Sequence, residues 1–388
     1  MNRLWPILVL GFVAFVTSFG AHVVAVNLPE YAAQVGVGVA MIGLLIAAYD
    51  LAEVVAKPLF GMLADRRGMK QTMLAGIGIF VLASLAYLVV DPRFLVLIRF
   101  LQGVGAAALS AVSLAMVGTY AAEWRGRAYG IYNSIKGAGY VVSPIIGGAI
   151  VLNANFAMIF VAAAAIGALA FVLSLFLPRI EGESSRIQDD DDIGLPALLG
   201  VFKQGDLWPW YVVTVVNMFF VGILFGFLPV RVYGLGYGPL TNGILLTAVS
   251  ASYLLIQPVA GALADRVKPG ITIRIGLLLA GLCVILIPFV TGAWLMAVAV
   301  LAGIGVGTVW TNTDALISQH AQTGQLGATM GAAGTFKEIG DMLGPLLIGL
   351  VSQAFGLTVG FVSCGVLGVI ALGLITRGSV LRAAPKRA

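Results

Sequence analysis

Acidic and basic side chains stand within long apolar stretches of this sequence, where a charge is costly and therefore informative. Asp50, Glu53 and Lys57 are spaced at i, i+3 and i+7, which predicts that they share one face of a helix. Lys337 and Asp341 are i, i+4 neighbours in a later stretch. A central Asp or Lys costs roughly 2.5 to 3.5 kcal/mol on membrane-insertion scales, so such side chains usually face a partner or a wet cavity. We interpret each group as an ion-pair cluster within a membrane-spanning helix.

Clustered carboxylates of this kind are able to hold and release protons. Burial and a neighbouring carboxylate raise the proton affinity of such a group, whereas a neighbouring lysine lowers it. An ion-pair network that opened and closed would therefore take up and release protons. We predict that proton coupling is carried by Asp50, Glu53, Asp341 and Glu338. The alternative is a fixed cluster of salt bridges that only holds helices together.

Further polar side chains at similar depth are candidates to line a substrate cavity. Lys136 and Lys337 would attract an anionic or zwitterionic compound, or each would instead neutralise a carboxylate. His22 can titrate near neutral pH, although a lone histidine packed with a hydrogen-bond partner is the simpler interpretation. Asp314 either joins the cavity or meets only interfacial water, and Trp310 either lines the cavity or packs. The predicted cavity residues are Lys136, Lys337, Asn217, Tyr140, Asp314 and His22.

The elements that must position these residues are apolar helices. Only 10% of the 388 residues are charged, against about 25% in an ordinary soluble domain, while 60% are hydrophobic. Apolar runs that reach the roughly 20 residues needed to cross a bilayer recur about twelve times. The alternation of polar and apolar residues that a transmembrane β-barrel requires is absent. The sequence therefore predicts an all-α membrane protein with about twelve transmembrane helices.

The same composition disfavours several other functions. Cys283 and Cys364 lie inside apolar runs and suit neither a metal site nor a disulfide framework. There is no nucleotide-binding loop and no nucleophile with its base, and His22 and His320 are the only histidines. The net charge of +5 suits the positive-inside rule of membrane proteins better than nucleic-acid binding. We therefore expect no enzyme activity, no metal or other cofactor and no nucleic-acid partner.

The spans are organised as two related halves around a polar segment. Lys and Arg gather on alternate sides of the spans, which predicts that both termini are cytoplasmic. We expect a six-helix bundle over residues 1–178, a cytoplasmic linker over 179–208, a second six-helix bundle over 209–376 and a cytoplasmic tail over 377–388. The halves repeat each other, since GMLADR returns as GALADR and Pro58 corresponds to Pro258. Such a repeat is one known design for transporters.

Three motifs carry a family resemblance. GMLADRRGMK after the second span resembles the loop signature of the major facilitator superfamily, and it recurs more weakly as GALADRVKPG. LIRFLQGVGAA resembles the fourth-helix motif of that superfamily. GYVVSPIIGG is similar to the fifth-helix motif of its drug:proton antiporters. Met69 and Ser143 depart from these patterns, although basic residues remain near Met69 and Ser143 is still small. The sequence is identified as a member of the superfamily, resembling its 12-helix drug:proton antiporter branch.

The resemblance implies a major facilitator fold, in which two pseudo-symmetric six-helix bundles rock about a central site. It implies that the second and eleventh spans adjoin, which would join their charges into one network. It also implies a role in proton transfer for Arg99, which has Glu30 or Asp50 within reach, although a buried ion pair holding two helices is the alternative.

Two further groups of residues take their expected roles from the motifs. A carboxylate at a helix end can bridge to a neighbouring helix or basic residue and latch the cytoplasmic face shut. The expected conformational latch consists of Asp65, Arg66, Arg67, Asp265 and Arg266. Small residues and proline shape close helix contacts and hinges. These packing roles are expected for Gly139, Pro144, Gly147, Gly148, Gly344 and Pro345.

The sequence thus predicts a proton-coupled secondary active transporter that exports small organic compounds, such as drugs or toxic metabolites, by alternating access. The alternative is a proton-coupled transporter of a specific organic anion, which Lys136 and Lys337 would favour. A channel or a membrane enzyme is less compatible with the motifs. The expected partners are a small-molecule substrate, protons and the lipid bilayer. We expect the protein in a bacterial inner membrane, and the resemblance implies a monomer.

Overall fold

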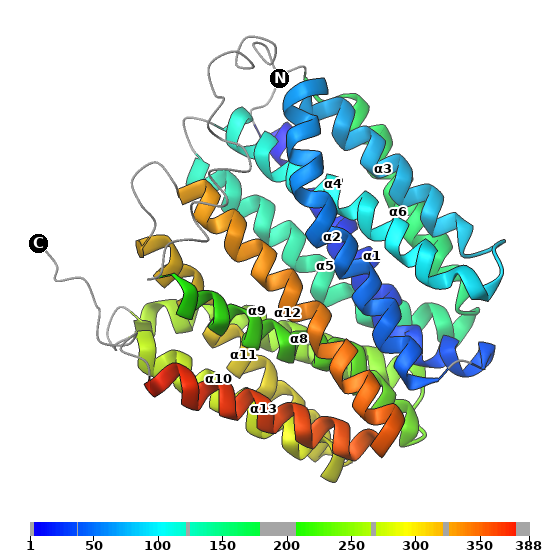
Figure 1. Ribbon diagram of the computed structural model, residues 1–388. Coiled ribbons are helices and arrows are strands. Elements are labelled where there is room, and N and C mark those ends of the chain that lie inside the picture. Colours follow the sequence, from blue (N-terminus) through cyan, green and yellow to red (C-terminus); the bar gives the residue numbers. More distant parts are fainter. Residues whose placement is uncertain are drawn as a thin grey trace, which may run out of the picture. The chain divides into compact units, whose positions relative to one another are not determined.

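The computed structural model describes residues 4–36, 38–121, 125–178, 207–264, 269–320 and 326–377 (Figure 1). Within these ranges the chain forms long α-helices and contains no β-strand. The helices of the first half are α1 (Trp5–Val35), α2 (Val39–Arg67), α3 (Met69–Ala86), α4 (Leu95–Tyr120), α5 (Arg125–Asn153) and α6 (Ala157–Leu175). Those of the second half are α8 (Trp208–Gly234), α9 (Pro239–Ala264), α10 (Pro269–Leu286), α11 (Gly292–His320), α12 (Leu326–Phe355) and α13 (Leu357–Arg377). The expected linker, apart from its last two residues, and the tail after Arg377 lie outside the described residues.

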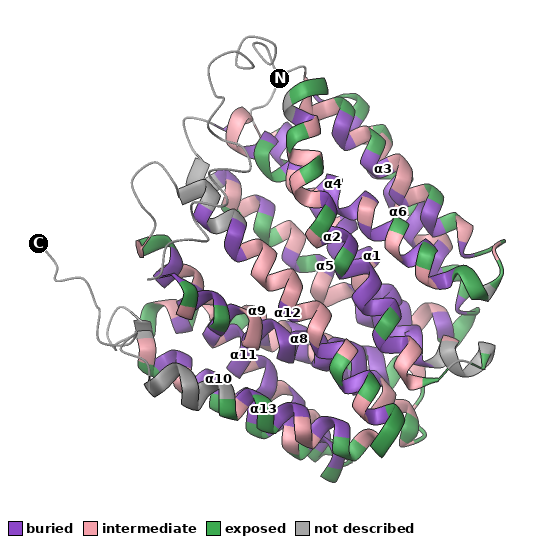
Figure 2. Ribbon diagram, viewed as in Figure 1, coloured by how far each residue is buried: buried purple, intermediate pink, exposed green. Residues whose placement is uncertain are grey.

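The lengths and surfaces of these helices are those of a membrane protein. In the described part of the chain, 10 helices are long and apolar enough to cross a bilayer. Charged residues interrupt α12 near its middle, and α13 contributes the shorter apolar segment Leu357–Ile370. Large apolar side chains are also exposed, with Leu255 at 74% and Trp294 at 73%, and buried and exposed residues share the same helices in Figure 2. The prediction of an all-α membrane protein built from twelve long helices is confirmed.

Prolines interrupt the helices at positions that match between the two halves. Pro29 lies within α1 and Pro229 within α8, while Pro58 lies within α2 and Pro258 within α9. An internal proline removes a backbone hydrogen bond, which a membrane helix tolerates when neighbouring helices satisfy the freed group. The matching positions are the structural counterpart of the sequence repeat.

The chain divides into two compact units. Unit 1 comprises Met1–Asp191 and Val232–Thr247, and unit 2 comprises Asp192–Arg231 and Ala248–Ala388. The first turns of α9 belong to unit 1 because their polar side chains donate to its backbone. Asn242 Nδ2 donates to Val26 O over 3.0 Å, and Thr247 Oγ1 donates to Val141 O over 2.9 Å.

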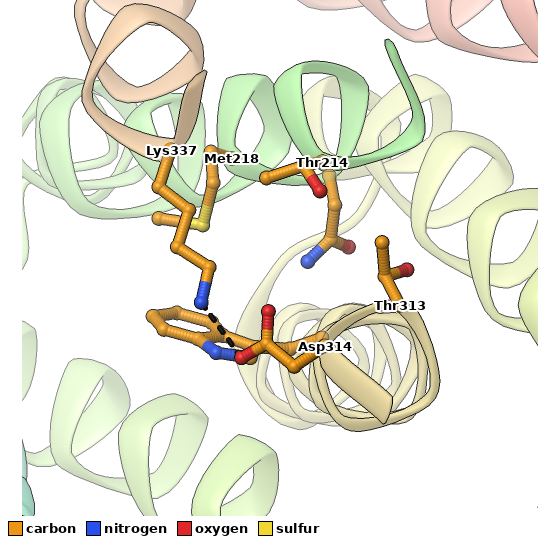
Figure 3. Close-up of a pocket in the computed structure, with 7 residues that line it drawn as sticks. Thr214, Met218, Thr313, Asp314 and Lys337 are labelled. Carbon is orange, nitrogen blue, oxygen red and sulfur yellow. Dashed lines mark hydrogen bonds and ion pairs between the residues drawn. The ribbon is translucent and has the colours of Figure 1, made fainter. Parts of the chain in front are cut away.

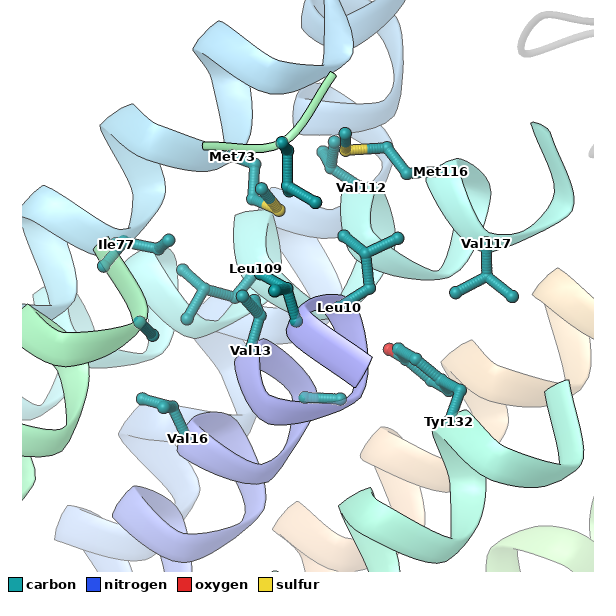
Figure 4. Close-up of a cluster of buried hydrophobic side chains, with 14 of the residues drawn as sticks. Leu10, Val13, Val16, Met73, Ile77, Leu109, Val112, Met116, Val117 and Tyr132 are labelled. Carbon is teal, nitrogen blue, oxygen red and sulfur yellow. The ribbon is translucent and has the colours of Figure 1, made fainter. Parts of the chain in front are cut away.

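An apolar core holds unit 1 together (Figure 4). Its side chains come from several helices and are almost completely buried. The labelled members are Leu10, Val13 and Val16 of α1, Met73 and Ile77 of α3, Leu109, Val112, Met116 and Val117 of α4, and Tyr132 of α5. In a bilayer such a core is stabilised mainly by dense packing, because lipid tails are as apolar as the side chains themselves.

Candidate functional site

The charged face of α2 is buried. Asp50 and Glu53 are 8% and 7% exposed, whereas Leu51 and Val55 on the other side of the helix are 44% and 51% exposed. Lys57 forms an ion pair with Glu53, one turn away. The order of the pair explains its formation, because a helical side chain leans toward the N-terminus and so Lys57 leans toward Glu53. The burial of Asp50 and Glu53 and the ion pair of Glu53 with Lys57 thus agree with the prediction that these residues share one face of α2.

Arg99 of α4 is held by neutral groups. It is 2% exposed; its Nη1 donates to Gln102 Oε1 over 2.8 Å and its Nη2 donates to Ala21 O over 3.1 Å. The guanidinium also lies over the Tyr49 ring, 4.4 Å from the centroid. Among the side chains that the structure describes, no carboxylate lies within ion-pair distance of Arg99. The expected approach of Asp50 is therefore not seen, and the side chain of Glu30 is not described.

A chain of hydrogen bonds and a glycine fix the position of this guanidinium. Gln102 Nε2 donates to Ser84 Oγ over 2.9 Å, and Ser84 Oγ donates to Phe80 O over 2.8 Å. One turn after Arg99, Gly103 lies directly against Tyr49 O and Ala52 of α2, where any side chain would collide. The residues of the fourth-helix motif therefore hold the guanidinium of Arg99 beside Tyr49, the residue that precedes Asp50.

A second group of predicted residues meets where α1 and α5 pack together. The rings of His22 and Tyr140 lie edge to face with centroids 4.4 Å apart. His22 Nδ1 lies 2.9 Å from Ser18 O; a carbonyl only accepts, so this nitrogen carries a proton. Ser18 Oγ in turn donates to Lys136 O over 2.8 Å. Three of the six predicted cavity residues, Lys136, Tyr140 and His22, therefore occupy one part of unit 1.

The other three predicted cavity residues meet in unit 2 (Figure 3). Lys337 Nζ of α12 lies 2.7 Å from Asp314 Oδ2 of α11 and 4.8 Å from the centroid of the Trp310 ring. A small pocket with a cavity volume of about 10 Å³ adjoins this ion pair. Its lining consists of Thr214, Asn217 and Met218 of α8, Trp310, Thr313 and Asp314 of α11, and Lys337. A cavity of this size holds about one water molecule, so a larger group enters only when a lining side chain moves.

Among the described residues, two buried acceptors in this pocket have no hydrogen-bond partner. Asn217 is 2% exposed; its Nδ2 donates to Val306 O over 3.2 Å, but its Oδ1 has no hydrogen-bond partner. Asp314 Oδ1 also has none. Thr214 and Thr313 donate their hydroxyls to the backbone oxygens of the preceding turn, which leaves oxygen lone pairs. The pocket is therefore rich in hydrogen-bond acceptors.

One predicted ion pair is wrong. Lys337 was expected to pair with Asp341 of its own helix, but its partner is Asp314 of α11. Because a helical side chain leans toward the N-terminus, Lys337 leans away from a residue four positions later. Asp314 is consequently an ion-pair partner rather than a residue that only meets interfacial water.

Some pocket residues were missed by the sequence interpretation. Thr214 and Met218 flank Asn217, and Thr313 precedes Asp314. Helical spacing could have indicated Thr313. Trp310, Thr313 and Asp314 stand at i, i+3 and i+4, which predicts that they share one face of a helix.

The predicted latch is only partly described. Arg66 and Arg67 are exposed at the end of α2; the side chain of Asp65 is not described, and Asp265 and Arg266 lie outside the described residues. The last basic residue of the loop motif, Lys70, has a defined role. Its Nζ donates to Leu175 O over 2.8 Å and to Leu177 O over 2.6 Å, so it caps the C-terminal end of α6.

The glycines of the packing motifs lie at close helix contacts. In unit 1, a side chain at Gly139 would meet Ser18, and one at Gly147 would meet Asn27. Gly148 lies against Pro239 O, and Pro144 O lies against Gly243. In unit 2, Gly344 lies against the backbone oxygen of Phe219, and the adjacent Pro345 contacts Gly222. None of these glycines has room for a β-carbon without a shift of its neighbour.

Comparisons with known proteins place the chain among transporters. A family model described as the Major Facilitator Superfamily matches residues 10–243 and 212–387. The chain is 26% identical over 414 residues to multidrug resistance protein Stp of Mycobacterium tuberculosis, covering 92% of this chain and 77% of Stp. It is 24% identical over 381 residues to multidrug resistance protein MdtG of Citrobacter koseri, covering 95% and 93%.

Solved structures agree with the chain in fold. A bacterial homologue of the human lysosomal transporter Spinster, inward-facing and unoccupied, has a TM-score of 0.82 at 16% identity, covering 98% of this chain and 97% of that one. A D-xylose–proton symporter has a TM-score of 0.79 at 13% identity, covering 97% of both chains.

Proposed function

The chain belongs to the Major Facilitator Superfamily and is an integral multi-pass membrane transporter of small molecules, not an enzyme; on that premise we propose that it exports organic compounds in exchange for protons. The compounds would be drugs or toxic metabolites, moved by alternating access. The observation that carries the proton coupling is the buried charge of unit 1. Asp50 and Glu53 are buried on α2, Lys57 pairs with Glu53, and the charge of Arg99 is balanced only by neutral groups among the described side chains.

These groups suggest how proton exchange would work. When α2 moves into a new environment, a change of the Lys57 side-chain rotamer that breaks its ion pair with Glu53 removes the charge that favours the ionised carboxylate. Conversely, the positive charge of Arg99 favours the ionised form of a carboxyl group that approaches it, so such a group would release its proton there. Rearrangement of the same helices would therefore both load and unload protons. Asp341 and Glu338 are the proposed carriers on α12.

The export of drugs is supported by relatives. Stp and MdtG are both named multidrug resistance proteins, and each aligns with most of this chain. The fold alone does not select a substrate, because the structural neighbours include a nucleoside transporter and a xylose–proton symporter. We place substrate contact at the two groups of polar residues, around His22, Tyr140 and Lys136 in unit 1 and around Asn217, Asp314 and Lys337 in unit 2.

The organic-anion alternative has less support in unit 2. It rested on Lys136 and Lys337 as cations that face the cavity. Lys337 is neutralised by Asp314, so an anion would have to break that ion pair. Lys136 is the remaining residue that favours an anionic substrate.

The rest of the mechanism follows the family's architecture. We propose six-helix bundles over residues 1–178 and 209–376 and a cytoplasmic latch of Asp65, Arg66 and Arg67 with Asp265 and Arg266. Pro144 and Pro345 with their neighbouring glycines would act as packing and hinge points. The protein would lie in the inner membrane as a monomer with both termini in the cytoplasm.

Proteoliposomes with an imposed pH gradient test this function. We expect the purified protein to move ethidium, a lipophilic cation, against its concentration gradient only while the pH gradient lasts. Asp50→Asn, Glu53→Gln and Asp341→Asn should each uncouple transport from the pH gradient. Asp91→Asn is the matched control, because this carboxylate is exposed outside the spans beside Arg93. Undiminished coupling in all three variants would overturn the proposal.

A further inference from the structure

We propose that Asp314 and Trp310 form a subsite for the protonated amine of a substrate, in which Lys337 stands as a tethered competitor. The inference rests on the proposed export function and narrows it to one substrate class. That class is organic cations that carry at least one N–H group.

The contacts of Lys337 are those of a bound ammonium ligand. Its Nζ lies 2.7 Å from Asp314 Oδ2 and 4.8 Å from the centre of the Trp310 ring. A carboxylate provides a charge-assisted hydrogen bond, and an aromatic face attracts the cation through its quadrupole. Figure 3 shows the ammonium of Lys337 reaching from α12 to the carboxylate of Asp314 on α11. A compound with a terminal amine can make the same two contacts.

The ion pair is open enough to be replaced. The side chains of Lys337 and Asp314 are 19% and 27% exposed, whereas the buried cation Arg99 is 2% exposed. The flexible four-carbon stem of a lysine allows its ammonium to swing away. The adjoining pocket of about 10 Å³ holds about one water molecule, so an amine takes the space that the Lys337 ammonium leaves when it swings away.

The unused acceptors point to a ligand that donates hydrogen bonds. Among the described residues, Asn217 Oδ1 is buried in the pocket lining without a hydrogen-bond partner, and Asp314 Oδ1 also lacks one. A buried oxygen without a hydrogen bond is unfavourable, so its presence in a pocket favours a ligand that supplies an N–H. An ammonium has up to three such donors, enough for the carboxylate and the amide together.

The negative charge of Asp314 excludes an anionic ligand from this subsite. An anion that captured Lys337 would leave the carboxylate of Asp314 beside it without a counter-ion, which is strongly unfavourable in a partly buried site. A cation that replaces Lys337 keeps one positive charge next to Asp314. The subsite therefore selects cations, and Lys337 weakens their binding by occupying it first.

A matched pair of probes tests the subsite on the purified full-length protein. The probes are dansylcadaverine, a fluorescent alkylamine that is protonated at neutral pH, and its N-acetylated derivative, which is neutral. Binding is followed by fluorescence anisotropy without a pH gradient. We expect Lys337→Met to bind the cationic probe about fivefold more tightly. Asp314→Asn should weaken that binding at least tenfold, and Trp310→Leu should weaken it about fivefold.

The neutral probe and one control variant make the outcome decisive. Lys70→Met removes a lysine that caps α6 and should leave binding of both probes unchanged. The acetylated probe should bind equally to the wild type and to Lys337→Met. If Lys337→Met binds the cation no more tightly, or if both probes change together, the subsite is refuted. The double change of Asp314→Asn with Lys337→Met leaves no charge in the site and should bind both probes equally, even if Asp314→Asn alone fails to fold.

The result is independent of proton coupling. If the charge-selective binding is found but no pH-driven transport occurs, the subsite stands and the proposed coupling fails. If transport follows the pH gradient but Lys337→Met does not favour the cationic probe, the export function stands and the subsite fails.

Discussion

Lys337 Nζ lies 2.7 Å from Asp314 Oδ2, so a lysine on α12 pairs with a carboxylate on the neighbouring α11. This pair differs from that of Glu53 and Lys57, which joins successive turns of α2. A pair within one helix cannot resist the separation of two helices. The pair between α11 and α12 can, and its rupture is therefore a candidate step in transport.

We predict that the Lys337–Asp314 pair shows energetic coupling. Asp314→Asn leaves an ammonium without its partner, whereas the double change with Lys337→Met removes both charges. We expect the double variant to unfold at a higher temperature than Asp314→Asn, with a coupling energy of about 1 kcal/mol for this partly exposed pair. Thermal unfolding of the four members of the cycle in detergent measures it. Strictly additive effects would show that the pair contributes nothing.

Arg99 should not be replaceable by lysine. Two nitrogens of its guanidinium donate to Gln102 and Ala21 while the plane lies over Tyr49, and a lysine ammonium cannot make these contacts together. We expect Arg99→Lys to fold but to lose at least about tenfold in proton-driven transport, a barrier change of roughly 1.4 kcal/mol. Transport assays in proteoliposomes measure the loss. Full activity of this variant would mean that charge alone suffices.

Gln102 should contribute mainly to stability. Gln102→Leu removes the acceptor of Arg99 Nη1 and leaves a buried charged donor short of a partner, which costs about 1 to 3 kcal/mol. Ser84→Ala is the matched control, because it removes the two outer bonds of the chain, from Gln102 to Ser84 and from Ser84 to Phe80, but leaves Arg99 its acceptor. We expect the unfolding midpoint to fall clearly further for Gln102→Leu than for Ser84→Ala. Equal shifts would argue against the hydrogen-bond chain.

Two glycines of α12 should respond differently to alanine. A β-carbon at Gly344 would collide with the backbone oxygen of Phe219 on α8, whereas the space around Gly334 is open. Gly344→Ala should therefore destabilise unit 2, and Gly334→Ala should be neutral or stabilising by up to about 1 kcal/mol from helix propensity. Unfolding midpoints in detergent compare the two. A similar loss in both variants would contradict the close contact of α8 with α12.

Much of the fold was predictable because the signals are local. The length and hydropathy of each span are set by its own residues, so the helices follow from the sequence alone. The pairing of Glu53 with Lys57 was predictable for the same reason, since both lie on one helix with the lysine second. The burial of Asp50 and Glu53 follows from the apolar residues on the opposite face of α2.

Contacts between helices were less predictable. The partner of Lys337 depends on how α11 and α12 pack, which no spacing within α12 reveals. The environment of Arg99 was also unexpected, because a buried cation normally suggests a carboxylate, whereas its contacts are an amide, a backbone oxygen and a ring. Thr214 and Met218 were missed because such residues are common in spans and carry no signal of their own.

Proton release on substrate binding is the sharpest test of the proposed exchange of organic compounds for protons. Ethidium is added to purified protein in a weakly buffered solution, and the pH change is recorded across the near-neutral range. We predict that binding releases protons from the wild type and that Asp50→Asn with Glu53→Gln removes most of this release. Binding of ethidium without proton release at any pH, or an unchanged release in the variant, would contradict proton-coupled export.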